Sequence, residues 1–165
     1  MPYAILTVVL VALDQLVKYL VLHNIPLGGH VPFIPYTVEL TYVQNTGAAF
    51  SMFAEHTWLL TLISLVMSVV LAVAIWKNFF AHPLGKLTLT LVLAGAVGNL
   101  IDRAFRHFVV DMFNVLFMDF AVFNVADCCV VVGGIAAALY YLFLMDKLEP
   151  KGEGATDDGT AEADG

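Results

Sequence analysis

Four long apolar segments are the feature that most constrains how this chain can fold. They run approximately over residues 3–22, 58–76, 84–101 and 128–145. Each is close to the roughly 20 apolar residues that an α-helix needs to cross a hydrocarbon core of about 30 Å. A composition of 61% hydrophobic and 13% charged residues also lies outside the usual range of soluble proteins. The sequence therefore predicts an all-α membrane protein with four transmembrane helices.

Basic residues near the ends of these segments predict the orientation. Arg103 and Arg106 lie near one set of ends, and four lysines lie near the other set: Lys77, Lys86, Lys147 and Lys151. Because lysine and arginine favour cytoplasmic loops, both termini are predicted to be cytoplasmic. The longer connections, about 23–57 and 102–127, then lie outside the cytoplasm. The first segment begins without charge and carries Asp14 and Lys18 deep inside, so we expect a retained span and not a cleaved signal peptide.

Two regions outside the spans have their own character. Residues 37–43 are β-prone and follow prolines, which predicts a small extracytoplasmic segment containing β-structure at the membrane surface. Residues 149–165 are rich in glycine and acid and predict a disordered cytoplasmic tail, which leaves residues 1–148 as one membrane domain. Much of the net charge of −7 comes from this tail, so nothing indicates a nucleic-acid partner.

Ionisable residues inside a span are costly unless they are paired or face water, so each one needs an explanation. Asp14 and Lys18 are four residues apart and share a helix face. We expect an ion pair that ties the first helix to the bundle, in preference to a direct part in chemistry. Lys18 could also extend to the membrane interface.

The motif "AGAVGNLIDR" closes the third span. Asn99, Asp102 and Arg103 stand at positions i, i+3 and i+4 on one face, while Gly95 and Gly98 allow a close helix approach. From spacing alone, Asp102 and Arg103 are expected to form an interfacial anchor. The amide of Asn99 lies among apolar neighbours and needs a partner.

Two further aspartates stand in apolar stretches at the same predicted side of the membrane. Asp127 in "FNVAD" follows Asn124 by three residues, so it could be a helix cap or a chemical group. Asp111 in "VVDMF" has no basic residue closer than Arg106. Two carboxylates that share a low-dielectric site do not both ionise easily and hold one proton between them. Such a pair can activate a water as general base while its partner acts as general acid, as in aspartic peptidases.

Other chemistries find less support. The chain has neither G-x-S-x-G nor H-E-x-x-H, and its five histidines show no ligand spacing, so we expect no metal and no cofactor. Cys128 and Cys129 lie within a span and are expected to serve packing. A small proton-coupled transporter or membrane binding protein stays open as the rival class, with Asp14 and Lys18 as its ion relay and the outer aspartates as its gate.

Five motifs, in order, resemble the lipoprotein signal peptidases, also called signal peptidase II: "ALDQLVK", "NTGAAFSMF", "GNLIDR", "VVDMF" and "FNVAD". The resemblance covers nearly the whole chain apart from the acidic tail. It implies an intramembrane aspartic endopeptidase of the bacterial cytoplasmic membrane. Such an enzyme cleaves diacylglyceryl-modified prolipoproteins just before the lipidated cysteine.

The resemblance also implies roles for individual residues. Asp111 and Asp127 correspond to the catalytic aspartates, near the extracytoplasmic surface. The positions implied to line the substrate site are Asn45, Asn99, Arg103 and Asn124, and those implied to support fold or site geometry are Asp14, Lys18 and Asp102. Gly47, as a small residue, suits a tight turn close to substrate. The implied partners are membrane lipid, the prolipoprotein and globomycin-like cyclic peptide inhibitors, with the enzyme a monomer. The segment from about 38 to 50 is expected to cover the dyad, and Asp119 matches no motif of the family.

Overall fold

The computed structural model describes residues 1–47 and 57–149, and within them it has four long helices. These are α1 (Pro2–Asn24), α2 (Thr57–Trp76), α3 (Pro83–Arg106) and α4 (Val125–Leu139), the last continued by η3 (Tyr140–Leu144) and α5 (Met145–Leu148). Each predicted span lies within one of these helical stretches, which are all long and apolar enough to cross a membrane. The predicted class, a four-helix membrane protein with a small β-containing segment, is confirmed.

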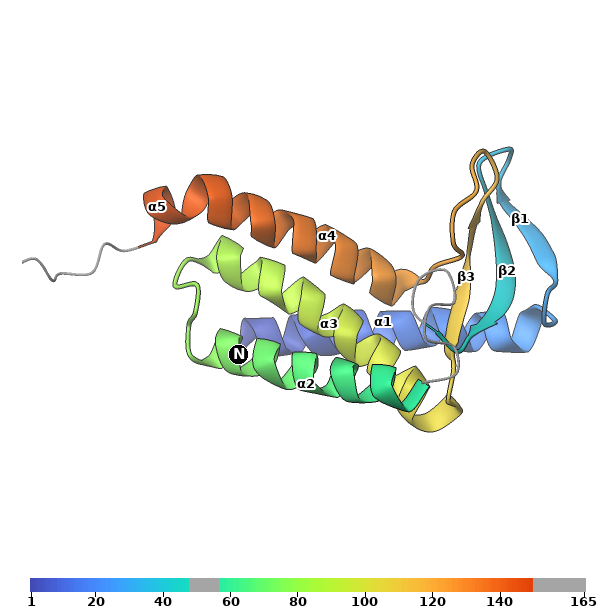
Figure 1. Ribbon diagram of the computed structural model, residues 1–165. Helices are drawn as coiled ribbons and strands as arrows, with labels where there is room; N and C mark the ends of the chain where they lie inside the picture. The colour runs from blue at the N-terminus through green and yellow to red at the C-terminus, as the bar shows by residue number, and fades with distance from the viewer. Residues whose placement is uncertain (48–56, 150–165) are drawn as a thin grey trace, which may run out of the picture.

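Helix α3 is the centre of the bundle and packs against α1, α2 and α4 (Figure 1). Its glycines permit this close packing. A Cβ atom at Gly95 would clash with the carbonyl oxygen of Ala126 on α4, and one at Gly98 would lie 2.7 Å from Oδ2 of Asp14 on α1. The predicted close approach at these glycines is therefore confirmed.

Local sequence signals set the ends of α3. Pro83 occupies its first turn, and the His82 side chain at the N-cap accepts a hydrogen bond from the Leu84 N–H at 3.2 Å. The helix continues past Ile101, where the predicted span stops, and ends at Arg106. His107 then takes a left-handed conformation, with φ of 65°, that turns the chain out of the helix. Asp102 and Arg103 therefore belong to the helix and not to the following connection.

A small antiparallel sheet lies across one end of the bundle (Figure 1). Among the described residues its strands are β1 (His30–Ile34), β2 (Val38–Asn45) and β3 (Val109–Val115), in that order. Strand β2 contains nearly all of the predicted β-prone segment, whereas β1 and β3 were not predicted. Residues 48–50, the end of the expected cover, lie outside the described residues. The sheet contacts α1 through one buried cluster: Val21, Ile25, Tyr42, Val110 and Met112.

The N-terminus, the α2–α3 connection and α5 lie at the opposite end of the bundle (Figure 1). Here the Glu149 carboxylate accepts hydrogen bonds from the Ala81 N–H at 2.8 Å and from the Tyr140 hydroxyl at 2.7 Å. Glu149, the first residue of the predicted disordered tail, is thus held against the α2–α3 connection. The rest of that tail, residues 150–165, lies outside the described residues.

Candidate active site

Asp111 and Asp127, which we call the dyad, come from different elements and line one cavity of about 690 Å³. Asp111 lies on β3, and Asp127 lies in the first turn of α4. The sheet end of the bundle brings the two elements together because α3 ends, and α4 begins, at the same surface. Asp111 and Asp127 therefore face one cavity, as their predicted positions on the same side of the membrane allow.

Asp111 is 2% exposed and is held by two side-chain amides. Its Oδ1 accepts from Nδ2 of Asn124 at 2.6 Å, and its Oδ2 accepts from Nδ2 of Asn45 at 2.9 Å. Burial raises the pKa of Asp111 to about 6, and the nearby charge of Asp127 adds to this rise, while the two amide hydrogen bonds oppose it. The Asp111 carboxyl therefore retains its proton to far higher pH than an ordinary aspartate.

Asp127 both caps a helix and faces the cavity. Its Oδ2 accepts from the Asn124 N–H at 3.1 Å, and Oδ1 of Asn124 accepts from the Asp127 N–H at 2.9 Å, which makes a capping box. Its Oδ1 accepts from Nδ2 of Asn99 on α3 at 2.7 Å. The two alternatives that the sequence left open for Asp127 are thus compatible, since the cap fixes the carboxylate at the cavity wall.

Asn99 and Asn124 connect the two carboxylates. Asn124 Nδ2 donates to Oδ1 of Asp111 and also to Oδ1 of Asn99 at 3.2 Å, while Asn99 donates to Asp127. Amides therefore bridge the dyad. Within residues 1–47 and 57–149, neither dyad carboxylate forms an ion pair with a basic side chain.

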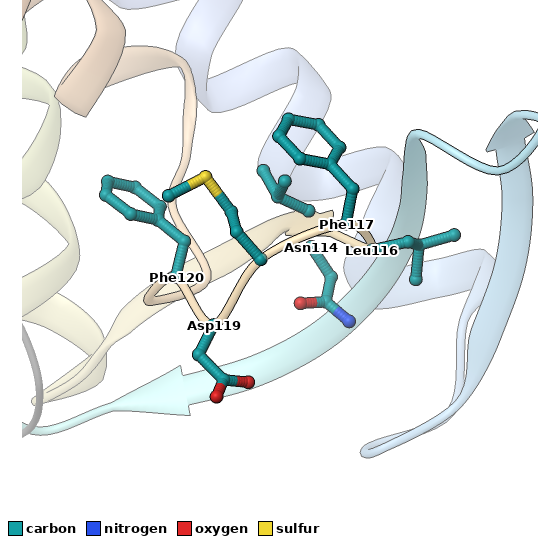
Figure 2. Close-up of a pocket in the computed structure, with 7 residues that line it drawn as sticks. Asn114, Leu116, Phe117, Asp119 and Phe120 are labelled. Atoms are coloured by element: carbon teal, nitrogen blue, oxygen red, sulfur yellow. The ribbon is translucent and has the colours of Figure 1, made fainter.

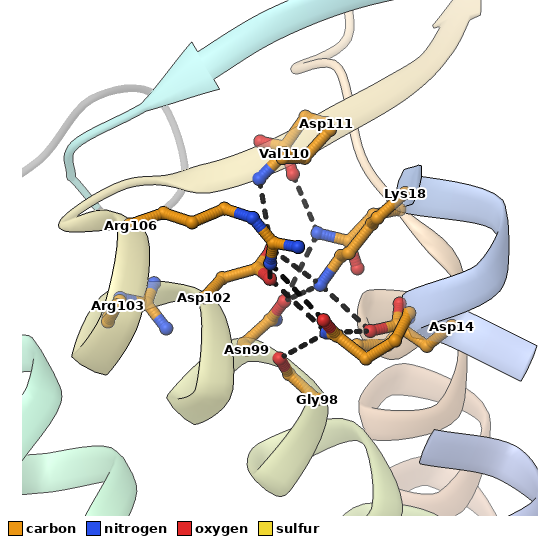
Figure 3. Close-up of polar contacts among 12 residues, drawn as sticks. Asp14, Lys18, Gly98, Asn99, Asp102, Arg103, Arg106, Val110 and Asp111 are labelled. Atoms are coloured by element: carbon orange, nitrogen blue, oxygen red, sulfur yellow. Dashed lines mark hydrogen bonds and ion pairs between the residues drawn. The ribbon is translucent and has the colours of Figure 1, made fainter. Parts of the chain in front are cut away.

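Beside the dyad lies a second polar group, which we call the ion cluster: Asp14, Gln15, Lys18, Asp102 and Arg106 (Figure 3). Lys18 Nζ lies 2.9 Å from Oδ2 of Asp14 and 3.0 Å from Oδ2 of Asp102. The predicted pair of Asp14 and Lys18 is confirmed. The predicted interfacial anchor is wrong for Asp102, which is fully buried and bonded to α1, and Lys18 is equally buried and does not reach the interface.

The ion cluster also contacts the backbone next to each member of the dyad. Asp14 Oδ1 accepts from the Ala126 N–H at 2.9 Å, one residue before Asp127. Asp102 Oδ2 accepts from the Val110 N–H at 3.1 Å, one residue before Asp111. The cluster therefore fixes the chain immediately before both dyad residues.

Lys18 reaches the dyad by a further contact. Its Nζ donates to Oδ1 of Asn99 at 3.0 Å, so the oxygen of this amide is turned toward Lys18 and its NH2 group toward Asp127. Lys18 thus sets the direction in which Asn99 donates.

Arg103 lies apart from the ion cluster (Figure 3). It donates from Nη2 to the Gly47 carbonyl at 3.3 Å and from Nη1 to Oγ of Ser64 at 3.5 Å. The Gly47 N–H in turn donates to Oδ1 of Asn45 at 2.9 Å. Arg103 lines the cavity, and its buried Nε has no hydrogen-bond partner in the described part of the chain. Asn99, Asp102 and Arg103 were expected to share one face of α3. In the structure Asn99 and Asp102 contact α1, whereas Arg103 contacts α2.

Sequence reasoning missed three residues of this site. Ser64 gave no signal, because a serine in an apolar span commonly donates its hydroxyl to a backbone carbonyl of its own helix. Ser68 forms such a bond here, to the Ser64 carbonyl. Arg106 stands four residues after Asp102, a spacing that could have indicated the pair. Gln15 adjoins Asp14 and donates to Oδ1 of Asp102 at 3.2 Å.

The remaining walls of the cavity are apolar. Ile63 and Met67 of α2 line one side, Val131 of α4 lines another, and Phe123 lies before α4. Cys128 also lines the cavity, so packing does not describe its position fully. No group of three or more metal-ligating side chains occurs among the described residues. The cavity wall therefore combines two carboxylates, two amides, the Ser64 hydroxyl and the Arg103 guanidinium with largely apolar side chains.

Comparison with known proteins agrees with this architecture. Residues 6–143 match the family described as Signal peptidase (SPase) II. A lipoprotein signal peptidase of Enterococcus faecalis is 41% identical over 155 residues, covering 94% of this chain and 96% of the relative. One from Streptococcus pneumoniae is 46% identical over 138 residues, covering 80% and 86%. A solved bacterial membrane enzyme superposes with a TM-score of 0.81 at 26% identity, covering 86% of this chain and 87% of that one. The chain belongs to the signal peptidase II family.

Proposed function

We propose that this membrane peptidase removes the signal peptide from diacylglyceryl-modified prolipoproteins, cutting just before the lipidated cysteine. One observation carries the proposal: two carboxylates, Asp111 and Asp127, are bridged by amides at the wall of an otherwise largely apolar cavity. Family membership supports it, since the relatives bear the name lipoprotein signal peptidase.

In the proposed reaction the dyad holds one proton. The ionised carboxylate takes a proton from a water molecule, whose oxygen attacks the carbonyl carbon of the scissile peptide bond. The protonated carboxyl donates its proton to the carbonyl oxygen, which gives a tetrahedral intermediate with two hydroxyl groups. When the intermediate collapses, the C–N bond breaks, the amine takes the proton that came from the water, and one hydroxyl returns its proton to the other carboxylate, so that the dyad again holds one proton. The raised pKa of Asp111, about 6, makes it the candidate proton donor.

The amides around the dyad give the carboxylates their orientation. The side-chain amides of Asn45, Asn99 and Asn124 donate to three of the four dyad oxygens, and the Asn124 backbone N–H donates to the fourth, Oδ2 of Asp127. Because a carboxylate oxygen accepts more than one hydrogen bond, the water and the substrate can still contact these oxygens. Arg103 brings to the same cavity a buried Nε–H that has no partner among residues 1–47 and 57–149, a suitable donor for a substrate carbonyl. Asp14, Lys18, Asp102 and Gly47 act one step away, by holding these groups in place.

The apolar walls suit a substrate that arrives through lipid. Ile63, Met67 and Val131 line the cavity and are also exposed on the helix surfaces, so the site is continuous with the apolar exterior of α2 and α4. An acylated substrate can therefore approach sideways with its chains still in the bilayer. We place the dyad at the extracytoplasmic end, opposite the lysine-rich connection, with both termini cytoplasmic. Globomycin-like cyclic peptides would compete with the substrate for this cavity. We further propose that the enzyme acts as a monomer, with the whole site on one chain.

Asp111→Asn and Asp127→Asn test the proposal in a gel-shift assay of prolipoprotein processing by the reconstituted enzyme. Each variant is expected to lose at least about 10³-fold in rate, because one half of the acid–base pair is removed. Asp119→Asn is the matched control. Asp119 is exposed in the connection between β3 and α4, so its substitution should leave the rate unchanged. Normal processing by either dyad variant contradicts the proposal. Proton or solute movement in liposomes that depends on Asp14 would instead support the rival carrier.

A further inference from the structure

The tip of the sheet is formed by two loops that carry exposed apolar side chains. The connection after β3 contains Leu116, Phe117, Met118 and Phe120, all exposed, with Phe117 at 69%. The β1–β2 turn beside it contains Tyr36, which is 93% exposed. The two loops are joined by a hydrogen bond from the Leu116 N–H to the Thr37 carbonyl at 2.9 Å. Contiguous apolar surface of this kind usually marks a contact with a protein or a membrane.

The position of the tip identifies the adjacent medium. The strands cross the end of the bundle, and the tip extends sideways past the start of α4 (Figure 1). Because the four helices span a membrane, their axes run approximately along its normal, and a sheet crossing their ends runs along its surface. The tip therefore overhangs the lipid beside α4, and the β3–α4 connection lies on the side of the sheet toward the helices (Figure 1).

The connection is also divided into an apolar and an acidic side. Phe117 and Phe120 point to one side of it, and Asp119 points to the opposite side (Figure 2). No lysine or arginine occurs between residues 107 and 146 or between residues 19 and 76, so the tip has no basic patch for anionic headgroups. Any attachment to lipid must therefore come from burial of apolar area.

We propose that residues 116–120 insert their apolar side into the interfacial layer of the leaflet at the sheet end of the molecule. Phe117 enters the boundary between headgroups and acyl chains, where aromatic rings are favoured, and Asp119 faces water. Phe120 also lines the dyad cavity and packs edge-on against Phe123 at 5.9 Å between ring centroids. The insertion thus fixes the height of one cavity wall relative to the lipid. It rests on the membrane spans and not on the proposed reaction.

Depth-dependent fluorescence quenching tests the insertion in the full chain reconstituted into phosphatidylcholine vesicles. The native tryptophans of α2 are first replaced (Trp58→Phe, Trp76→Phe), and a single probe is then introduced as Phe117→Trp or as Asp119→Trp. Lipids brominated near the glycerol end of the chain should quench Phe117→Trp at least about twofold more strongly than Asp119→Trp. Water-soluble acrylamide should show the reverse order, and added salt should leave both unchanged.

Equal quenching of the two probes by lipid, or strong acrylamide quenching of Phe117→Trp, overturns the proposal because the tip then lies in water. Protection of Phe117→Trp from both quenchers, with an effect that grows with the protein-to-lipid ratio, also overturns it, because a second copy of the chain then covers the tip. Retained thermal unfolding of each variant shows that the probe reports on the native fold.

Discussion

Two groups of carboxylates, all buried except the half-buried Asp127, adjoin each other at the sheet end of the bundle, and they differ in what holds them. In the ion cluster, Lys18 and Arg106 pair with the carboxylates of Asp14 and Asp102. In the dyad, side-chain amides take this place, and the described residues provide no basic partner. Asp111 is as buried as Asp14 and Asp102, so burial alone does not distinguish the two groups.

The difference in partners separates structure from chemistry. A cation in direct contact favours the ionised carboxylate and opposes protonation, which suits a fixed link between helices. An amide orients a carboxylate without supplying a full charge, so a proton can still be shared and moved. The ion cluster is therefore suited to hold the backbone before Asp111 and Asp127, and the dyad to exchange protons. If this interpretation is right, substitutions in the two groups should have opposite effects on stability and catalysis.

Removal of the central cation should have the largest effect on stability. Lys18→Met leaves Asp14 and Asp102 buried without their shared ammonium, and an uncompensated buried charge of this kind costs about 3–5 kcal/mol. We expect a loss of that size in the free energy of unfolding, measured by denaturant titration in detergent micelles.

Arg106→Met is the matched control for this change. Its side chain is partly exposed and pairs with Asp102 from the edge of the cluster, so its loss should cost about 1 kcal/mol or less. Lys18→Met could instead unfold at the same denaturant concentration as the wild type and still fail to cleave. That result would mean that the cation acts in the chemistry and that the division between the two groups is wrong.

In the dyad the expected stability effect has the opposite sign and depends on pH. The folded protein raises the pKa of Asp111 to about 6 from the ordinary aspartate value of 3.8, so the folded state binds a proton more tightly than the unfolded state. Its stability relative to Asp111→Asn should therefore fall as pH rises from about 4 to above 6, by on the order of 1–3 kcal/mol. Thermal unfolding of both proteins across this range measures the difference. Parallel curves would show that Asp111 is not held protonated by its surroundings.

Hydropathy was sufficient to predict the four spans, and i,i+4 spacing was sufficient to predict the pair of Asp14 and Lys18. Strand β3 was not predictable in this way, because "VVDMFNV" has no clear alternation and its partner strand β2 is remote in the sequence. Only part of the ion cluster could be predicted from the sequence. Its bonds to Val110 and Ala126 use backbone N–H groups, which leave no mark on the side-chain pattern.

The assignment of Asp102 failed for a related physical reason. Spacing on α3 shows which residues share a face, but not which helix that face meets. The motifs marked Asn124 as a site residue, yet its bonds to Asp111, Asn99 and Asp127 depend on three elements meeting at one point. Sequence reasoning thus located the polar residues and left their grouping to the fold.

The smallest predicted effect lies at the corner that connects the two groups. His107 follows Arg106 of the ion cluster and precedes β3, which carries Asp111, and its φ of 65° and ψ of 10° lie in the left-handed region. That conformation costs a residue with a Cβ about 1–2 kcal/mol, and substitution by glycine removes this cost. Glycine also has greater freedom in the unfolded chain, which lowers the resulting gain in stability by about 0.5–1 kcal/mol. His107→Gly should therefore stabilise the protein by about 0.5 kcal/mol in denaturant titration. His107→Ala, which keeps the Cβ, should not stabilise the protein.

Since the exposed imidazole of His107 lines neither group, kcat/KM for prolipoprotein should stay within about twofold of wild type for both variants. A larger loss of activity in both would mean that the corner contacts substrate, so that the boundary between the structural and the chemical group lies elsewhere than at Arg106.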